Sequence, residues 1–212
     1  MLIASYNPSQ MGDILVVILG EDVKNQAEAE KNNVVRIYNQ DNNETIGFNF
    51  LNASKILPTL AQHNGQVILS AEDVAKLNQV LEESDLEQEI QLDKDSKFVV
   101  GYVKTVKPHP KSDHLKITET VVDNDNTLQI VSSSPNMQEN IKVVVAKVGA
   151  MMPNGLIIWP GELKGEPSNG MICSGRELKI PNAPQKPGAL ILPDSYQVGD
   201  AFNPKAATDL FV

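Results

Sequence analysis

The sequence has 212 residues, of which 41% are hydrophobic and 5% aromatic, and its formal net charge is −9. No apolar run approaches the roughly 20 residues that cross a bilayer, and the amino terminus lacks the basic residues that begin a secretory signal. The single cysteine, Cys173, excludes an internal disulfide and fits a reducing compartment, so we expect a cytoplasmic protein without membrane association.

The negative charge is concentrated in the first half. Residues 1–94 contain 6 Lys and Arg against 15 Asp and Glu, whereas residues 95–212 contain 12 of each. Residues 97–180 contain 10 basic and 8 acidic residues. A neutral domain binds a polyanion when its basic residues share one face, so the total charge does not exclude nucleic-acid binding by the second half. We expect such binding to be weak.

Short β-rich runs alternate with turns in the first half. Residues 13–20 form a nearly continuous apolar run, which is typical of a buried strand. Residues 34–39 and 45–50 are predicted to form a hairpin around a polar cluster. Residues 52–57 fit a short helix that stops before Pro58.

One amphipathic helix is predicted after residue 70. Ser70 is its expected N-cap, with Asp73 as the capping-box partner. The apolar residues with helical spacing are Val74, Leu77 and Leu81. The acidic stretch at 82–89 suits a solvated helix end or a linker, which places a domain boundary near residues 90–96.

The second half is predicted to be all-β. Residues 98–107 form a long strand in which Gly101 indicates strong coiling or a bulge, and Pro108 and Pro110 end it. Further strands are expected at 114–123, 127–131, 141–148 and 169–173. Five short strands with one long coiled first strand suit a small barrel of the OB type.

These patterns define the predicted architecture. We expect an α+β domain over residues 1–92 and an all-β OB-fold barrel over residues 96–180. Residues 181–212 form a C-terminal extension that is rich in proline and glycine. Its apolar run at 189–192 and the late Phe202 and Phe211 suggest a contact between two copies in a homodimer.

Several motifs of the second half have family-like spacing. They are G-Y-V-K at 101–104, P-H-P-K-S-D-H-L at 108–115, L-Q-I-V at 128–131, P-N at 135–136, V-V-V-A at 143–146, G-A-M-M-P-N-G at 149–155 and L-K-G-E-P-S-N-G-M-I-C-S at 163–174. Together they resemble the tRNA-binding domain of bacterial phenylalanyl-tRNA synthetase β subunits, which also extends some methionyl-tRNA synthetases and occurs as free-standing dimers. The acidic first half resembles the YtpR group of stand-alone proteins. One departure is Ser132-Ser133-Ser134, where the family often has Cys-Gly-Ala, so a thiol in that loop plays no part here.

An OB barrel binds single strands across one face, with cations on the phosphates and flat side chains against the bases. The candidate RNA-binding residues are Lys104, Lys107, Lys111, Lys116, Asn136, Lys164, Ser168, Asn169, Met171, Ser174 and Arg176. The candidate stacking groups are Tyr102, His109, Trp159 and Met171, although packing is the favoured role of Trp159. With so few of them, recognition of the shape of an exposed RNA loop or end is favoured over stacking of several bases.

Each candidate also has a structural interpretation. A lysine can be an ordinary solvated residue, Asn136 and the 168–170 segment can be turns, and Cys173 can be a small buried residue. The spacing of His109 and His114 matches no common zinc site, and the glycines match no phosphate loop. We expect no metal, no cofactor and no enzymatic activity.

The leading hypothesis is a non-catalytic, dimeric protein that binds tRNA or another structured RNA. The alternative is a dimeric, chaperone-like or scaffold protein that binds peptides. A third reading is an accessory subunit that delivers tRNA to an aminoacyl-tRNA synthetase. The sequence leaves open which RNA is bound and what residues 1–92 do.

Overall fold

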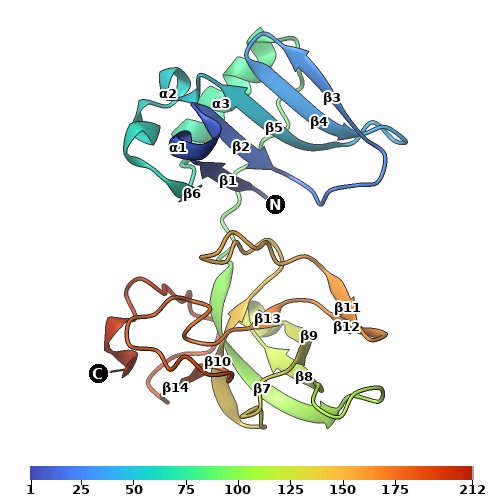
Figure 1. The fold of residues 1–212 in the computed structure, drawn as a ribbon, viewed down its shortest axis with the longest axis vertical. Coiled ribbons are helices and arrows are strands. Elements are labelled where there is room, and N and C mark those ends of the chain that lie inside the picture. Colours follow the sequence, from blue (N-terminus) through green and yellow to red (C-terminus); the bar gives the residue numbers. More distant parts are fainter. Residues whose placement is uncertain (212) are drawn as a thin grey trace. The chain divides into compact units, whose positions relative to one another are not determined.

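A computed structural model describes residues 1–211 of the chain (Figure 1). The chain divides into two compact units, one spanning Met1–Lys94 and one that begins at Asp95. Both units are built on antiparallel sheets. Within residues 1–211, no helix is both long enough and apolar enough to cross a bilayer.

The amino-terminal unit is a six-stranded antiparallel sheet with the order β3-β4-β5-β2-β1-β6. The strands are β1 Ile3–Tyr6, β2 Ile14–Ile18, β3 Gln26–Lys31, β4 Val34–Asn39, β5 Thr45–Leu51 and β6 Gly65–Val67. A strand is confirmed at the predicted position as β2, although it is buried at Leu15 and Val17 alone and half-buried at its other residues, and the predicted hairpin is confirmed as β4 and β5. The sequence does not predict β1, β3 or β6.

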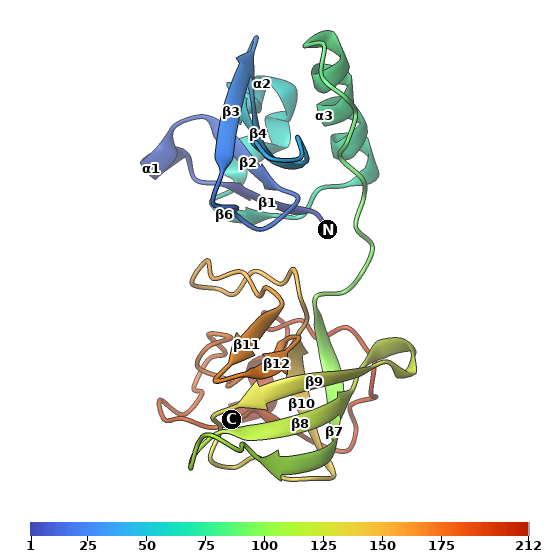
Figure 2. The ribbon, with the colours of Figure 1, turned by 90° about the vertical axis from the view of Figure 1, so that its right-hand side faces the viewer.

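The helices of this unit are α1 Pro8–Met11, α2 Ala53–Ile56, the 3-10 helix η1 Pro58–Gln62 and α3 Ala71–Glu83. Figures 1 and 2 show α2 and α3 on the same side of the sheet. The predicted capping box is confirmed, because Ser70 Oγ accepts from the Asp73 N–H at 3.1 Å and Asp73 Oδ2 accepts from the Ser70 N–H at 2.9 Å. Leu77 and Leu81 are fully buried in the core beneath α3.

The acidic stretch after α3 differs from a simple linker. The chain turns back at Ser84, and Ile90 is 2% exposed within the core of the amino-terminal unit. The side chain of Asn78 holds it there, because its Nδ2 donates to the Ile90 carbonyl at 2.8 Å and its Oδ1 accepts from the Ile90 N–H at 3.1 Å. Glu82 and Glu83 form the exposed end of α3, as expected for a solvated helix end, whereas the acidic residues from Asp85 onward belong to a segment that packs against the unit through Leu86 and Ile90.

The second unit contains a nearly closed barrel with the strand order β13-β10-β7-β8-β9, which confirms the expected OB-type architecture. Its elements are β7 Phe98–Pro108, β8 Lys116–Val121, the 3-10 helix η2 Asp123–Asp125, β9 Thr127–Ser132, β10 Ile141–Ala146, β11 Gly161–Leu163, β12 Glu166–Ser168 and β13 Met171–Ile172. The fifth strand is shorter than predicted, and the β11–β12 hairpin that precedes it is not predicted.

Gly101 makes the coiling of β7 possible. A Cβ at this position would lie 2.5 Å from Val145 Cγ2 and 2.9 Å from Thr120 Cγ2. The register of β7 against β8 shifts between Val103 and Thr105, so the expected irregularity is present slightly downstream of the glycine. The strand therefore bends around a barrel interior that has no room for a side chain at position 101.

The C-terminal extension packs against its own barrel. β14, Ile191–Leu192, pairs with the first residues of β10, and the Phe202 N–H donates to the Phe98 carbonyl at 2.8 Å. Leu190, Leu192 and Phe202 are buried, and a 3-10 helix, η3 Thr208–Phe211, follows. Most of the apolar residues that suggested a dimer contact are therefore covered within the same chain, and the dimer stays a prediction.

We expect Gly101→Ala to destabilise the barrel by about 1–3 kcal/mol, because the new methyl group overpacks the interior. Urea unfolding followed by Trp159 fluorescence isolates this unit, since Trp159 is the single tryptophan of the sequence. Gly161→Ala is the matched control, because its Cβ would approach no closer than 4.0 Å to the Trp159 carbonyl. Equal midpoints for the two variants would contradict the packing argument.

Cys173 provides a second test of the core. The residue is fully buried, and this burial raises the pKa of its thiol to about 12. We expect the native thiol to react with a disulfide reagent at pH 8 about a thousandfold more slowly than in denaturant, because the thiolate is the nucleophile. In the unfolded chain the pKa of this thiol is near its ordinary value of 9.0. The contribution of the thiol to the free energy of unfolding therefore falls as the pH rises from 9.0 towards about 12. Rapid labelling of the folded protein would show that the thiol is accessible.

Candidate nucleic-acid interface

Hydrogen bonds between β9 and the segment that joins β12 to β13 close the barrel. The Asn169 N–H donates to the Gln129 carbonyl at 2.9 Å, and Gln129 Nε2 donates to the Pro167 carbonyl at 2.9 Å. Ser168 Oγ accepts from the Val131 N–H at 3.1 Å. The closure thus uses the hydroxyl of Ser168 and the backbone of Asn169, while the Asn169 residue as a whole stays exposed.

The loop between β7 and β8 is joined to the β11–β12 hairpin through His109, which is 3% exposed. Its Nδ1 accepts from the Lys111 N–H at 3.0 Å, and its Nε2 lies 2.9 Å from the Leu163 carbonyl oxygen. A backbone N–H can only donate, so Nδ1 is unprotonated and Nε2 carries the proton that it donates to Leu163. The neutral ring fixes the loop to the hairpin and is too buried to stack on a base.

Lys111 and Lys164 come together at this junction. Lys164 and Gly165 form the two-residue turn of the hairpin, with φ angles of 50° and 93°, as a type I′ turn requires. Lys164 Nζ donates to Ser112 Oγ at 3.3 Å, and a Cβ on Gly165 would lie 2.7 Å from Lys111 Nζ. The glycine therefore allows the turn and makes room for the second ammonium group.

The other predicted cations have different surroundings. Lys104, Lys107 and Arg176 are exposed. Lys116 is half-buried, and its Nζ donates to the Met137 carbonyl at 2.9 Å, so this ammonium group already has a partner in the chain. An RNA contact by Lys116 stays a prediction that would require this bond to be shared or broken.

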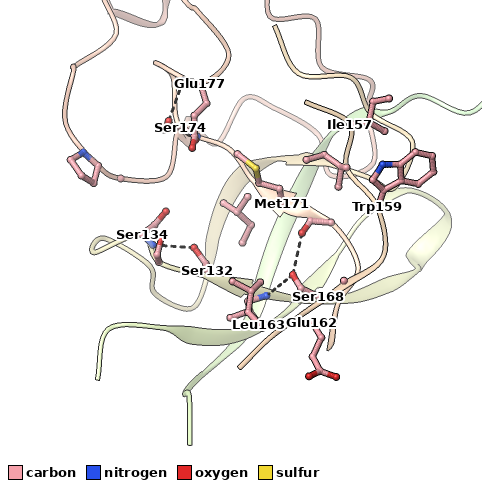
Figure 3. A pocket seen from close by; sticks show the side chains of 18 of the residues that line it. Ser132, Ser134, Ile157, Trp159, Glu162, Leu163, Ser168, Met171, Ser174 and Glu177 are labelled. Carbon is pink, nitrogen blue, oxygen red and sulfur yellow. Dashed lines mark hydrogen bonds between the residues drawn. The ribbon is translucent and has the colours of Figure 1, made fainter. Parts of the chain in front are cut away.

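A pocket of about 420 Å³ lies beside the hairpin (Figure 3). Trp159 and Met171 are half-buried in its lining, and Arg176 also lines it. Its small residues include Ser132, Ser133, Ser134, Gly161, Gly170 and Gly188. Figure 3 shows Trp159 on the opposite side of Met171 from Ser132 and Ser134. An indole, a thioether and small polar groups around one hollow suit a planar ring as ligand.

Asn136 and Ser174 organise the surroundings of the pocket. Asn136 Nδ2 donates to the Ala189 carbonyl at 2.9 Å, and its Oδ1 accepts from the Ala189 N–H at 2.8 Å. Ser174 Oγ donates to Glu177 Oε2 at 2.6 Å and accepts from the Glu177 N–H at 3.2 Å. These side chains hold the loops in place, and a direct contact with RNA stays a prediction for both.

Sequence reasoning favours packing for Trp159 and gives no role to Leu163, yet both line the pocket. The sequence could have indicated the accessibility of Trp159, because Pro153, Gly155 and Pro160 lie close to it along the chain. Proline and glycine at this frequency indicate a loop, and hence an accessible indole.

Among residues 1–211, no group of three or more His, Cys, Asp and Glu side chains is placed to hold a metal ion. His114 Nδ1 instead lies 3.0 Å from Asp113 Oδ1, and this hydrogen bond lowers the pKa of the Asp113 carboxyl. The expectation that the protein works without a metal stays a prediction.

Two family models match the chain. Residues 98–201 match the domain described as "Putative tRNA binding domain", and residues 21–93 match a domain of unknown function, DUF4479. The first match coincides with the barrel and most of its C-terminal extension.

Relatives match one or both units. The Bacillus subtilis protein described as "Putative tRNA-binding protein YtpR" is 44% identical over 200 residues, which cover 94% of this chain and 98% of that protein. The phenylalanine–tRNA ligase β subunit of Nitratidesulfovibrio vulgaris is 39% identical over 102 residues, covering 48% of this chain and 12% of the subunit. That of Rickettsia bellii is 38% identical over 141 residues, covering 65% of this chain and 16% of the subunit.

The resemblance read from the motifs is thus confirmed, because the match to YtpR runs through both units at 44% identity and the barrel matches the domain model. The chain belongs to the YtpR family, whose barrel domain also occurs in phenylalanine–tRNA ligase β subunits.

Proposed function

We propose that this protein binds tRNA, or another structured RNA, at the junction of the β7–β8 loop and the β11–β12 hairpin. The observation that carries the proposal is the convergence of Lys111 and Lys164 on one exposed edge next to the pocket. Two cations fixed by a buried histidine suit phosphate contacts, which supply most of the affinity for a polyanion. The printed names of the relatives and of the domain support tRNA as the ligand.

The pocket supplies a contact of a different kind. An unpaired base that enters it stacks against the indole of Trp159, while Arg176 contacts a neighbouring phosphate. Stacking on an aromatic ring tolerates all four bases, so this contact contributes affinity more than sequence specificity. We call the edge that carries Lys111 and Lys164 the lysine edge. The shape of the RNA is then recognised through the distance between the lysine edge and the pocket.

The proposed role is binding without catalysis. The hydroxyls of Ser168 and Ser174 are held in hydrogen bonds that support the fold, and the raised pKa keeps the thiol of Cys173 protonated. These groups are therefore poor nucleophiles as arranged here. The Bacillus subtilis relative, which is named for tRNA binding, also supports this proposal.

We further propose a cytoplasmic homodimer that cooperates with an aminoacyl-tRNA synthetase. A lone thiol suits a reducing compartment, and the domain shared with phenylalanine–tRNA ligase β subunits supports a link to tRNA aminoacylation. Ile191 and Val198 of the extension remain exposed, at 41% and 37%, and are available for a contact between copies.

We expect Lys111→Ala combined with Lys164→Ala to weaken tRNA binding about tenfold or more at low salt. If about 3–5 phosphates are neutralised, log K for the natural sequence falls against log salt with a slope of roughly −2 to −3.5. The double variant should reduce that slope by about 1.5, because two phosphate contacts are lost. Fluorescence polarisation with labelled tRNA over a salt series measures both quantities.

Lys24→Ala with Lys205→Ala is the matched control, because both lysines are exposed, belong neither to the β7–β8 loop nor to the β11–β12 hairpin, and change the net charge equally. Equal losses in the two double variants would show a non-specific charge effect. A slope near zero for the natural sequence would remove RNA as the ligand and favour the peptide-binding alternative.

Trp159→Ala tests the pocket. We expect tRNA to quench the fluorescence of Trp159 in the natural sequence and the substitution to cost about 1–3 kcal/mol of binding free energy. Trp159→Phe keeps an aromatic face and should retain most of the affinity. Unchanged affinity in Trp159→Ala would restrict the site to the lysine edge.

A further inference from the structure

The sheet of the amino-terminal unit has a second face that no long helix covers. The side chains on one face of an antiparallel pair lie directly opposite each other, so the register identifies the members of each face. One row across this face consists of Gln66, Ser5, Val16, Asn49, Val35 and Glu30, and the next consists of Ile3, Ile18, Gly47, Ile37 and Glu28. We call these two rows, together with the pair Ile14 and Leu51, the open face.

The core of the unit is built from the opposite face. Leu15 and Val17 of β2 pair with Phe50 and Phe48 of β5, and all four are buried beneath α3. The apolar residues of the open face do not belong to this core cluster. Figures 1 and 2 show α2 and α3 on the core side, whereas the single turn of α1 stands on the other side.

The composition of the open face is unusual for a face that meets water. An antiparallel sheet with one solvated face alternates apolar and polar residues along each strand. β2 instead reads Ile-Leu-Val-Val-Ile, and its open-face residues Ile14, Val16 and Ile18 are half-buried. Such a strand is typical of a sheet covered on both sides, whereas the single turn of α1 is the helix on this side. Ile3, at the end of its row, is 2% exposed, so the accessible part of the face consists of the half-buried aliphatic residues of β2, β4 and β5. A continuous aliphatic patch of this kind marks an interaction surface.

Asn49 lies in the middle of the open face. Within the part of the chain that the structure describes, its Oδ1 is a buried side-chain oxygen without a hydrogen-bond partner. This oxygen is closed off from solvent, so a bound partner does not reach it. The contact that the face offers is therefore aliphatic.

The charge around the open face indicates the kind of partner. Both rows end on β3 at an exposed glutamate, Glu30 in one row and Glu28 in the next. Residues 1–94 carry a net charge of −9, so a second copy or an RNA would meet like charge. We propose that the open face binds a protein surface of aliphatic side chains flanked by lysine or arginine.

A synthetic peptide of about ten residues provides the probe, with alternating valine and threonine in the centre and two lysines at each end. Its counterpart has glutamate in place of lysine. We expect fluorescence polarisation with the full chain to show saturable binding of the lysine peptide below about 1 mM and at least about tenfold weaker binding of the glutamate peptide. Equal binding of both peptides, or no saturable binding of the lysine peptide, would overturn the proposal.

Two variants, each with its own control, locate the site. Glu28→Lys with Glu30→Lys should weaken the lysine peptide at least about tenfold, whereas Glu82→Lys with Glu87→Lys, an equal charge change on exposed residues at the end of α3 and beyond it, should have a much smaller effect. Ile37→Glu should abolish binding, and Leu156→Glu, at a leucine of the barrel unit that is 55% exposed, should not. Equal effects of the two charge reversals would overturn the proposal even if Ile37→Glu fails to fold.

Sedimentation of the same samples tests whether a second copy of the chain binds the open face instead. A dimer that Ile37→Glu dissociates would assign the open face to a second copy and overturn the proposal of a basic partner. A mass that does not change between the natural sequence and this variant supports it.

Discussion

The hydrogen bonds between β9 and the chain around Ser168 are the constraint on which the binding side of the barrel depends. They fix the position where the β11–β12 hairpin returns to the barrel, and the hairpin carries Lys164 and Leu163. The Leu163 carbonyl in turn accepts a hydrogen bond from His109, and this bond fixes the position of the β7–β8 loop and of Lys111. The Ser168 hydroxyl, the Gln129 side-chain amide and four backbone groups thus determine where two ammonium groups meet. Because each bond contributes only about 1 kcal/mol, the arrangement relies on their acting together.

For the barrel unit, the positions of the basic residues matter more for RNA binding than its net charge does. Basic and acidic residues are equal in number from residue 95 onward, and several lysines are occupied within the chain. Lys142 holds carbonyl groups of the extension, and Lys147 is paired with Asp123. Among the exposed cations, Lys104 and Lys107 lie on β7, whereas Lys111 and Lys164 lie on a loop and a hairpin turn whose geometry is fixed by the buried His109. An RNA is then attracted to the edge that carries Lys111 and Lys164 instead of to the whole surface.

Local features could be predicted from the sequence, and features set by distant partners could not. The capping box at Ser70 and the stripe beneath α3 depend on neighbours within one or two turns, so the residue pattern contains them. The strand at Gln26–Lys31 reads Gln-Ala-Glu-Ala-Glu-Lys and has little β character of its own, because its pairing with β4 decides its structure.

The same distinction explains the candidate site. Lys111 and Lys164 were identifiable as cations, but their meeting depends on a histidine bond across 54 positions. Asn136 and Ser168 have the composition of ligand-binding residues, yet their partners lie 53 and 37 positions away, at Ala189 and Val131. Only the folded chain shows that these polar groups are already occupied.

The pairing of β14 with the first residues of β10 has a consequence for how the barrel can be divided. β13 covers Val145 and Ala146, and β14 covers Lys142 and Val143, so two separate segments share one side of the same strand. A fragment that ends at Ile180 would leave the front half of β10 with unpaired N–H and C=O groups, and such an edge is a template for strand addition between molecules. The extension thus acts as a protective cap against aggregation, and the smallest soluble piece of this domain reaches well beyond its five strands.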